Sequence, residues 1–185
     1  MNGGSASNGE NMEIRKCTKE DVAQVGAFYD RVVAWLDANG VNYPKWTYGE
    51  YPSVLSARAN AAKGTQYVCM ERDVPVGAFV LNDNPEGNYA KGAWSRNLAE
   101  GEYMVLHALA VAPDRFGNGI GSAMVRFAID EAKARGYKGF RLDIVPGNKP
   151  ARKLYEQYGF RYVGTYDLDR HIAHIPLFCL YELDW

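Results

Sequence analysis

The stretch from Leu106 to Ser122 limits the possible folds of this chain more than any other part of the sequence. It begins with an apolar run, Leu106 to Val111, which is long enough for a buried strand, and Pro113 ends that run. Glycine then occupies every second position from Gly117 to Gly121, and an amphipathic helical pattern follows until Gly136. The stretch therefore predicts a strand, a glycine loop and a helix in immediate succession.

This arrangement is typical of a site for an anionic group. Glycine lacks a Cβ, so the backbone can approach a ligand closely, and the first N–H groups of a helix have no intrahelical acceptor. A phosphate placed there gains those donors and the positive end of the helix dipole. The alternative is an ordinary turn between a strand and a helix, which usually needs one glycine.

Two known phosphate motifs can be compared with this loop. A P-loop is excluded, because no Gly-Lys-Ser/Thr follows the glycines. A dinucleotide fingerprint is closer, with Ser122 at the third glycine position and Asp143 at a suitable distance downstream. However, only one further helix is predicted after this one, which argues against a complete dinucleotide-binding domain.

A second motif lies downstream and reads Asn148-Lys-Pro-Ala151-Arg-Lys-Leu-Tyr155-Glu-Gln-Tyr-Gly159-Phe160. It matches the pattern Asn-x-x-Ala-x-x-x-Tyr-x-x-x-Gly-Phe, and together with the glycine loop it resembles the Gcn5-related N-acetyltransferase (GNAT) superfamily. The resemblance covers roughly Met12 to Trp185 and implies acetyl-CoA as the cosubstrate. One position departs from the family pattern: Phe116 stands where arginine or glutamine is usual, and Arg115 lies one place earlier.

The resemblance implies that the coenzyme is bound mostly by backbone groups. The strand would meet the pantetheine arm, the glycine loop would hold the pyrophosphate, and the second motif would supply further contacts. Asn148 has an alternative role as a helix cap, and Lys153 as part of a solvated basic face. The residues expected at the coenzyme are Leu109, Ala110, Val111, Arg115, Phe116, Gly117, Asn118, Gly119, Ile120, Gly121, Ser122, Asn148, Ala151, Lys153 and Tyr155.

Three residues are candidates for acid–base catalysis of acetyl transfer. Tyr155 corresponds to the family tyrosine beside the thioester sulfur and is the candidate acid, while a buried packing role is its alternative. A histidine at position 107 resembles the arylalkylamine acetyltransferase branch, and its ordinary pKa suits a general base. Spacing alone would also fit a hydrogen-bonded core histidine. Glu102, at the start of the same strand, could act as the base through water.

The acceptor site is expected in two loops, 41–52 and 82–100. In the resembled family, the first helices and their loop line this site. The first loop contains four aromatic residues, of which Trp46 and Tyr48 are the candidate acceptor contacts; simple packing on the core is the alternative. The second loop is long for a compact domain, and such loops are usually functional or mobile.

The remaining predicted elements define the fold class. Strands are expected at 13–17, 65–71, 74–81, 102–111, 140–145, 160–166 and 175–181, and helices at about 18–39 and 53–63 and after the glycine loop and Asn148. This mixed order predicts an α/β (α+β) protein. We expect a single GNAT-like domain, 12–185, with a mixed, mostly antiparallel sheet of about six to seven strands flanked by about four helices.

Composition excludes several other classes of protein. The formal net charge of −1 argues against a general nucleic-acid or membrane-surface binder. No apolar run is long enough to span a membrane, and residues 1–11 contain no apolar signal core and are expected to form a flexible leader. The three cysteines lack metal-binding spacing and their odd number suits the reducing cytoplasm, so no metal is expected.

These observations predict an acetyl-CoA-dependent N-acetyltransferase that acts on the primary amine of a small molecule. Two alternatives stay open: acetylation of a protein lysine or N-terminus, and a non-catalytic acyl-CoA-binding regulator. Neither acceptor loop contains a motif that identifies the amine. Dimers are frequent in such families, so a homodimer is considered by analogy only.

Overall fold

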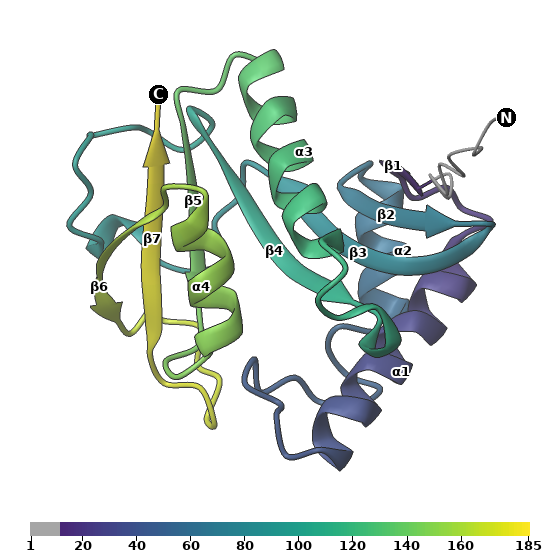
Figure 1. The fold of residues 1–185 in the computed structure, drawn as a ribbon. Helices are drawn as coiled ribbons and strands as arrows, with labels where there is room; N and C mark the ends of the chain where they lie inside the picture. Colours follow the sequence, from purple (N-terminus) through teal and green to yellow (C-terminus); the bar gives the residue numbers. More distant parts are fainter. Residues whose placement is uncertain (1–11) are drawn as a thin grey trace, which may run out of the picture.

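The computed structural model describes residues 12–185, in which one sheet carries helices on both faces (Figure 1). The seven strands are β1 (Met12–Lys16), β2 (Gln66–Glu71), β3 (Val74–Asn82), β4 (Tyr103–Val111), β5 (Gly139–Ile144), β6 (Arg161–Tyr166) and β7 (Phe178–Asp184). Their spatial order is β1-β2-β3-β4-β5-β7-β6, and every neighbouring pair is antiparallel except β4 and β5. The expected mixed sheet is therefore confirmed. The leader predicted at residues 1–11 lies outside the described residues.

Four α-helices cover the sheet, as the sequence predicted. They are α1 (Val22–Ala38), α2 (Val54–Ala62), α3 (Ile120–Ala134) and α4 (Lys149–Gln157), with 3-10 turns η1 (Tyr89–Lys91) and η2 (Pro113–Arg115). Helices α3 and α4 lie on one face, and α1 and α2 lie on the other (Figure 1). Buried residues of α3 recur at helical spacing from Ile120 to Ala132, and Gly136 follows the helix with a φ of +81°. No helix among residues 12–185 has the length and apolar character needed to cross a bilayer.

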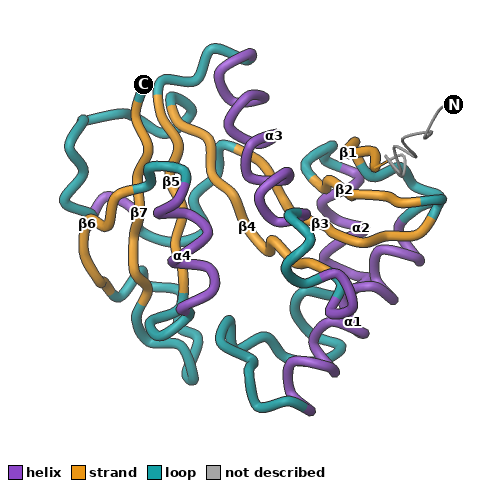
Figure 2. The backbone as a smooth tube through the Cα atoms, in the orientation of Figure 1, coloured by secondary structure: helices purple, strands orange, loops and turns teal. Residues whose placement is uncertain are grey.

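The seam between β4 and β5 positions the functional site. The two strands pair in parallel only from Tyr103 to Val105, opposite Gly139 to Arg141. Beyond these residues the strands diverge (Figures 1 and 2). Parallel strands leave unpaired backbone groups wherever they separate, and such groups need another partner. The open part of the seam is therefore the natural place for a ligand that offers backbone-like hydrogen bonds.

A bulge in β4 accompanies this divergence. Val80 pairs with His107 and Ala78 pairs with Ala110, so β4 has an extra residue in this interval, and Ala108 has a φ of +47°. The buried Tyr29 hydroxyl donates to the Ala108 carbonyl at 3.3 Å and accepts from Gln66 Nε2 at 3.0 Å. Helix α1 and strand β2 thus support the bulge from behind.

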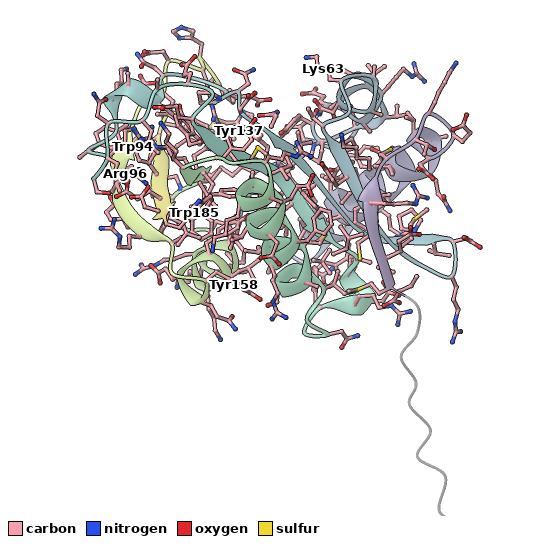
Figure 3. The ribbon with its side chains drawn as sticks, turned by 90° about the horizontal axis from the view of Figure 1, so that it is seen from above. Lys63, Trp94, Arg96, Tyr137, Tyr158 and Trp185 are labelled. Atoms are coloured by element: carbon pink, nitrogen blue, oxygen red, sulfur yellow. The ribbon has the colours of Figure 1, made fainter. Side chains whose placement is uncertain are left out.

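The last expected strand and the expected placement of the long loop after β3 differ from the structure. The last strand was expected at 175–181 but spans Phe178–Asp184, because Ile175 is buried in a turn in which its N–H donates to the Ile172 carbonyl at 2.9 Å. Much of the long loop after β3 packs over the sheet end that carries β6 and β7, where Trp94 and Arg96 lie (Figure 3). Arg96 Nη1 donates to the Lys138 carbonyl at 2.7 Å. Only Glu86 from this loop lines the cavity described below.

Candidate active site

A cavity of about 1050 Å³ occupies the opening between β4 and β5. Its lining includes both strands, the glycine loop, α4, the loop after α1 and the loop before β7. Most residues predicted for the site lie on this lining, namely Trp46, His107, Leu109, Ala110, Val111, Arg115, Phe116, Gly117, Gly119, Ile120, Gly121, Ser122, Asn148, Ala151, Lys153 and Tyr155. The structure does not bring Tyr48, Glu102 and Asn118 to the cavity.

The glycine loop presents backbone donors at one end of the cavity. Gly117 and Gly119 have φ values of +81° and +79°, a region in which side chains are strained. Gly119 is the N-cap of α3 and provides no side-chain cap, and the Ala123 N–H donates to its carbonyl at 2.9 Å. The N–H groups of the preceding helical residues have no intrahelical acceptor. A diphosphate fits this donor set in charge and hydrogen-bonding character.

Gly121 allows α4 to lie close to this loop. A Cβ at Gly121 would lie 3.4 Å from Leu154 Cδ2, so the Leu154 side chain of α4 packs directly over the Gly121 backbone. The Tyr158 hydroxyl also donates to the Ser122 carbonyl at 3.0 Å. The second sequence motif is thereby attached to the first. Asn148 caps α4 by accepting from the Ala151 N–H at 3.3 Å, which agrees with the capping alternative.

The unusual pair Arg115 and Phe116 lies beside the loop in a defined arrangement. Arg115 Nη2 forms an ion pair with Glu71 Oε2 at 3.0 Å. Phe116 is 46% exposed and contacts the edge of Trp35, with ring centroids 5.3 Å apart. Because Glu71 neutralises the Arg115 charge, the backbone is the stronger candidate for binding an anion here.

Tyr155 extends from α4 toward the open seam. Its side chain is buried, its ring packs at 65° against Phe160, and it lines the cavity. Burial raises the pKa of its hydroxyl, and the negative charge of Asp143 adds to this effect. No residue among 12–185 forms a hydrogen bond with the Tyr155 hydroxyl, so the hydroxyl is a proton donor without a protein partner.

His107 lies on β4 with its imidazole held by Asn82. The distance from His107 Nε2 to Asn82 Oδ1 is 3.1 Å, and Oδ1 also accepts from the Asn84 N–H at 3.0 Å. Since a backbone N–H can only donate, it identifies this atom as an acceptor, and Nε2 must carry the proton. The lone pair is then on Nδ1. Burial lowers the pKa of His107, whereas the nearby carboxylates Glu86 and Asp143 raise it.

Glu102 lies far from these groups. Its carboxylate pairs with Lys138 Nζ and accepts from the Ala99 N–H at 2.8 Å, and its pKa is lowered chiefly by the Lys138 contact. His107 lies five positions further along the chain, which corresponds to about 16 Å of extended backbone. Glu102 also lies at the end where β4 and β5 are bonded to each other. The expectation that Glu102 could act at the same site as His107 is therefore wrong, although the two residues are close in sequence.

A buried ion pair forms the other wall of the cavity. Arg170 Nη1 donates to Asp143 Oδ1 at 2.9 Å and Arg170 Nη2 donates to Asp143 Oδ2 at 2.5 Å. The Tyr89 hydroxyl donates to the same carboxylate at 2.6 Å. In the sequence, Asp143 is marked only by its distance from the glycine loop in a possible dinucleotide fingerprint, and no motif marks Arg170. The pair attaches the loop between β6 and β7 to β5.

Two loops meet across the cavity mouth. Lys45 Nζ donates to the His174 carbonyl at 3.5 Å, and His174 Nε2 lies 3.3 Å from the Lys45 carbonyl. Trp46 lines the cavity as expected, and Tyr51 from the same loop joins it, whereas Tyr48 is 59% exposed. Burial raises the pKa of Tyr51, with Glu86 as the next contribution. The acceptor end is thus partly enclosed by aromatic side chains.

Comparison with known proteins gives a consistent result. A family model described as "Acetyltransferase (GNAT) family" matches residues 29–160. An uncharacterized N-acetyltransferase of Methanocaldococcus jannaschii is 27% identical over 80% of this chain and 59% of its own length. The chain thus spans less than two thirds of that relative. A mycothiol acetyltransferase of Clavibacter michiganensis is 33% identical over 45% of this chain and 26% of its own length.

Solved structures share the fold. An acetyltransferase of the GNAT family from Streptococcus agalactiae superposes with a TM-score of 0.74 at 17% identity, covering 94% of this chain and 95% of its own. A putative acetyltransferase of Salmonella typhimurium, solved with acetyl-CoA, has a TM-score of 0.65 at 18% identity, covering 94% and 93%. At these identities the similarity concerns the fold alone.

Proposed function

Because residues 29–160 match its family model, the chain belongs to the acetyltransferase (GNAT) family, and we propose that it transfers an acetyl group from acetyl-CoA to the primary amine of a small molecule. The observation that supports this proposal best is the single cavity shared by the glycine loop, Tyr155 and His107. One lining surface offers donors for a diphosphate, and another offers an acid and a base.

The coenzyme would be held mainly by backbone groups. The N–H groups at the start of α3 would bind the diphosphate, and the unpaired edge of β4 from Leu109 to Val111 would bind the pantetheine arm. Bound acetyl-CoA would supply the acetyl group as an activated thioester. The separated strands leave room for an extended chain between them, because their backbone groups are not bonded to each other.

Residues of the chain would then make the proton transfers that the reaction requires. An alkylamine is a cation at neutral pH and needs a base before its nitrogen can attack. His107 Nδ1 would accept this proton, since Asn82 fixes the other nitrogen as a donor. The Tyr155 hydroxyl would give a proton to the departing thiolate as the C–S bond breaks and the N–C bond forms. Its raised pKa keeps it protonated until that step.

The form of the acceptor end favours a small molecule over a protein. The contacts between Lys45 and His174 join two loops across the mouth, whereas a protein substrate would need an open groove. Trp46 and Tyr51 supply apolar surface for the body of the amine. The free state of Cys17, Cys69 and Cys179 is consistent with the cytoplasmic location that we propose.

Calorimetry with CoA and acetyl-CoA tests the first half of the proposal. We expect binding of both, and the absence of heat at millimolar concentrations would refute the assignment. A mass-spectrometric screen of amines with isotope-labelled acetyl-CoA tests the second half. Labelled small amines support the proposal, labelled peptides alone support protein acetylation, and binding without transfer to any acceptor supports a regulator.

A further inference from the structure

The turn Pro85-Glu86-Gly87 brings a carboxylate to the acceptor end of the cavity. It belongs to the loop after β3, and Glu86 is the residue of this loop that lines the cavity. No sequence motif marks Glu86 within this segment, which is rich in Asn, Gly and Pro. Its relevance follows from how the turn is held and from what its side chain lacks.

Contacts with the loop between β6 and β7 fix the turn in place. Arg170 Nε donates to the Glu86 carbonyl, and the Asn88 N–H donates to the Leu168 carbonyl at 2.8 Å. Gly87 has a φ of +108°, and a Cβ there would lie 2.7 Å from the Leu168 carbonyl oxygen. The backbone on both sides of Glu86 is therefore constrained. These contacts define where the Glu86 side chain leaves the backbone.

The Glu86 carboxylate has no partner among the described residues. None of residues 12–185 forms an ion pair or side-chain hydrogen bond with it, although Arg170 is close enough to contact its carbonyl. Arg170 directs its two terminal nitrogens to Asp143 instead. Asp143 is thus neutralised and Glu86 is not. Glu86 is exposed, so its negative charge lies at the solvent-accessible wall of the cavity.

This charge acts on the groups proposed for chemistry. Glu86, His107 and Tyr51 line the same cavity, and the Glu86 carboxylate raises the pKa of both other side chains. Asp143 also raises the pKa of His107, while Arg170 and burial lower it. A carboxylate in this position would attract a cation that approaches the imidazole, and it would also stabilise the imidazolium once the proton has moved.

We propose that Glu86 binds the protonated amine of the acceptor and holds it beside His107, so that the preferred acceptors are amines that are cationic at neutral pH. The inference rests on the proposed function. The ammonium group pairs with the Glu86 carboxylate and gives one proton to His107 Nδ1, leaving a neutral amine whose lone pair attacks the thioester. The N–C bond forms as the C–S bond breaks, the departing thiolate takes the Tyr155 hydroxyl proton, and the second nitrogen proton returns to the Tyr155 oxygen. Glu86 stays ionised throughout and acts as a binding residue rather than as the base.

A pair of nearly isosteric probes tests this inference. Phenethylamine is cationic at neutral pH, whereas O-benzylhydroxylamine, with oxygen in place of one methylene, is neutral. Both suit the aromatic lining. Binding of each probe to the full chain is measured by calorimetry, with and without CoA. We expect the unmodified protein to prefer phenethylamine, and Glu86→Gln to weaken phenethylamine binding about tenfold or more while hardly changing O-benzylhydroxylamine binding.

Glu50→Gln is the matched comparator, because Glu50 also lines the cavity but belongs to the loop after α1 rather than to the turn that Arg170 holds. We expect it to change the preference much less than Glu86→Gln. The inference is overturned if the unmodified protein shows no preference, if Glu86→Gln keeps the preference, or if both variants lose it equally. Failure of the proposed function would appear separately, as absent CoA binding.

A second measurement does not depend on any substrate. The imidazole signal of His107, assigned by its loss in His107→Gln, is titrated by NMR in the unmodified protein and in Glu86→Gln. Removal of the Glu86 charge should lower the pKa of His107 further. An unchanged titration would show that Glu86 does not act at the base and would contradict the proposal.

Discussion

Replacement of Tyr155 by phenylalanine separates chemistry from packing unusually well at this site. The ring is buried against Phe160, and phenylalanine keeps this contact. No residue among 12–185 hydrogen-bonds to the hydroxyl, so the variant leaves no buried protein group unpaired. The change in the free energy of unfolding should therefore be within about 0.5 kcal/mol.

The effect on turnover should be much larger. If the hydroxyl protonates the departing thiolate, its loss should lower kcat by about tenfold or more, which equals about 1.4 kcal/mol or more in the activation free energy. The raised pKa of Tyr155 also means that kcat should not fall with pH until well above the ordinary tyrosine value. Thiol release is measured at saturating acetyl-CoA and amine, and stability by thermal unfolding.

Two results would refute this reasoning. Unchanged kcat in Tyr155→Phe would remove the hydroxyl from the mechanism. A large loss of thermal stability would mean that the hydroxyl has a structural role, so that reduced turnover could not be assigned to proton transfer.

The other predictions concern the base, the acceptor loop and the stability of the fold. His107→Ala should abolish the acidic limb of the kcat/KM profile, which in the unmodified protein should lie below the ordinary histidine pKa because burial lowers it; an unaltered limb would exclude His107. Trp46→Ala should raise the KM for the amine several-fold and Tyr48→Ala should not, since Trp46 lines the cavity and Tyr48 does not; equal effects of the two substitutions would contradict this placement. Arg15 lowers the pKa of Asp21 to about 2, so Asp21→Asn should reduce the free energy of unfolding by about 1–2 kcal/mol at neutral pH. This difference should be full above the unfolded-state pKa and vanish as pH falls toward about 2, and denaturant unfolding at several pH values would reveal a constant difference if the argument is wrong.

The parts of the site predictable from sequence are those that local chemistry determines. The glycines from Gly117 to Gly121 indicate a loop with an unusual backbone conformation, and they also mark the start of the following helix. Tyr155 follows Asn148 at a spacing that fixes its position on α4 relative to the cap. In each case the informative residues are close together in the sequence, so their spacing in the sequence determines their relative positions in the structure.

The parts that sequence did not supply depend on contacts between distant segments. Arg170 reaches Asp143 across 27 positions of sequence, and nothing in the composition of its loop marks this pairing. Glu86 acquires its position from the same loop. Glu102 was expected near the site because it begins the correct strand, but a strand extends too far per residue for its two ends to serve one site.

The short seam between β4 and β5 has a consequence for the architecture of the molecule. Strands β1 to β4 all precede α3 in sequence, and β5 to β7 all follow it. A chain cleaved in the turn after α3 would keep, within one fragment or the other, every strand pairing except that of β4 with β5. The one sheet of the described protein thus consists of two locally built halves joined along three positions, which makes the protein a natural candidate for reconstitution from complementary fragments.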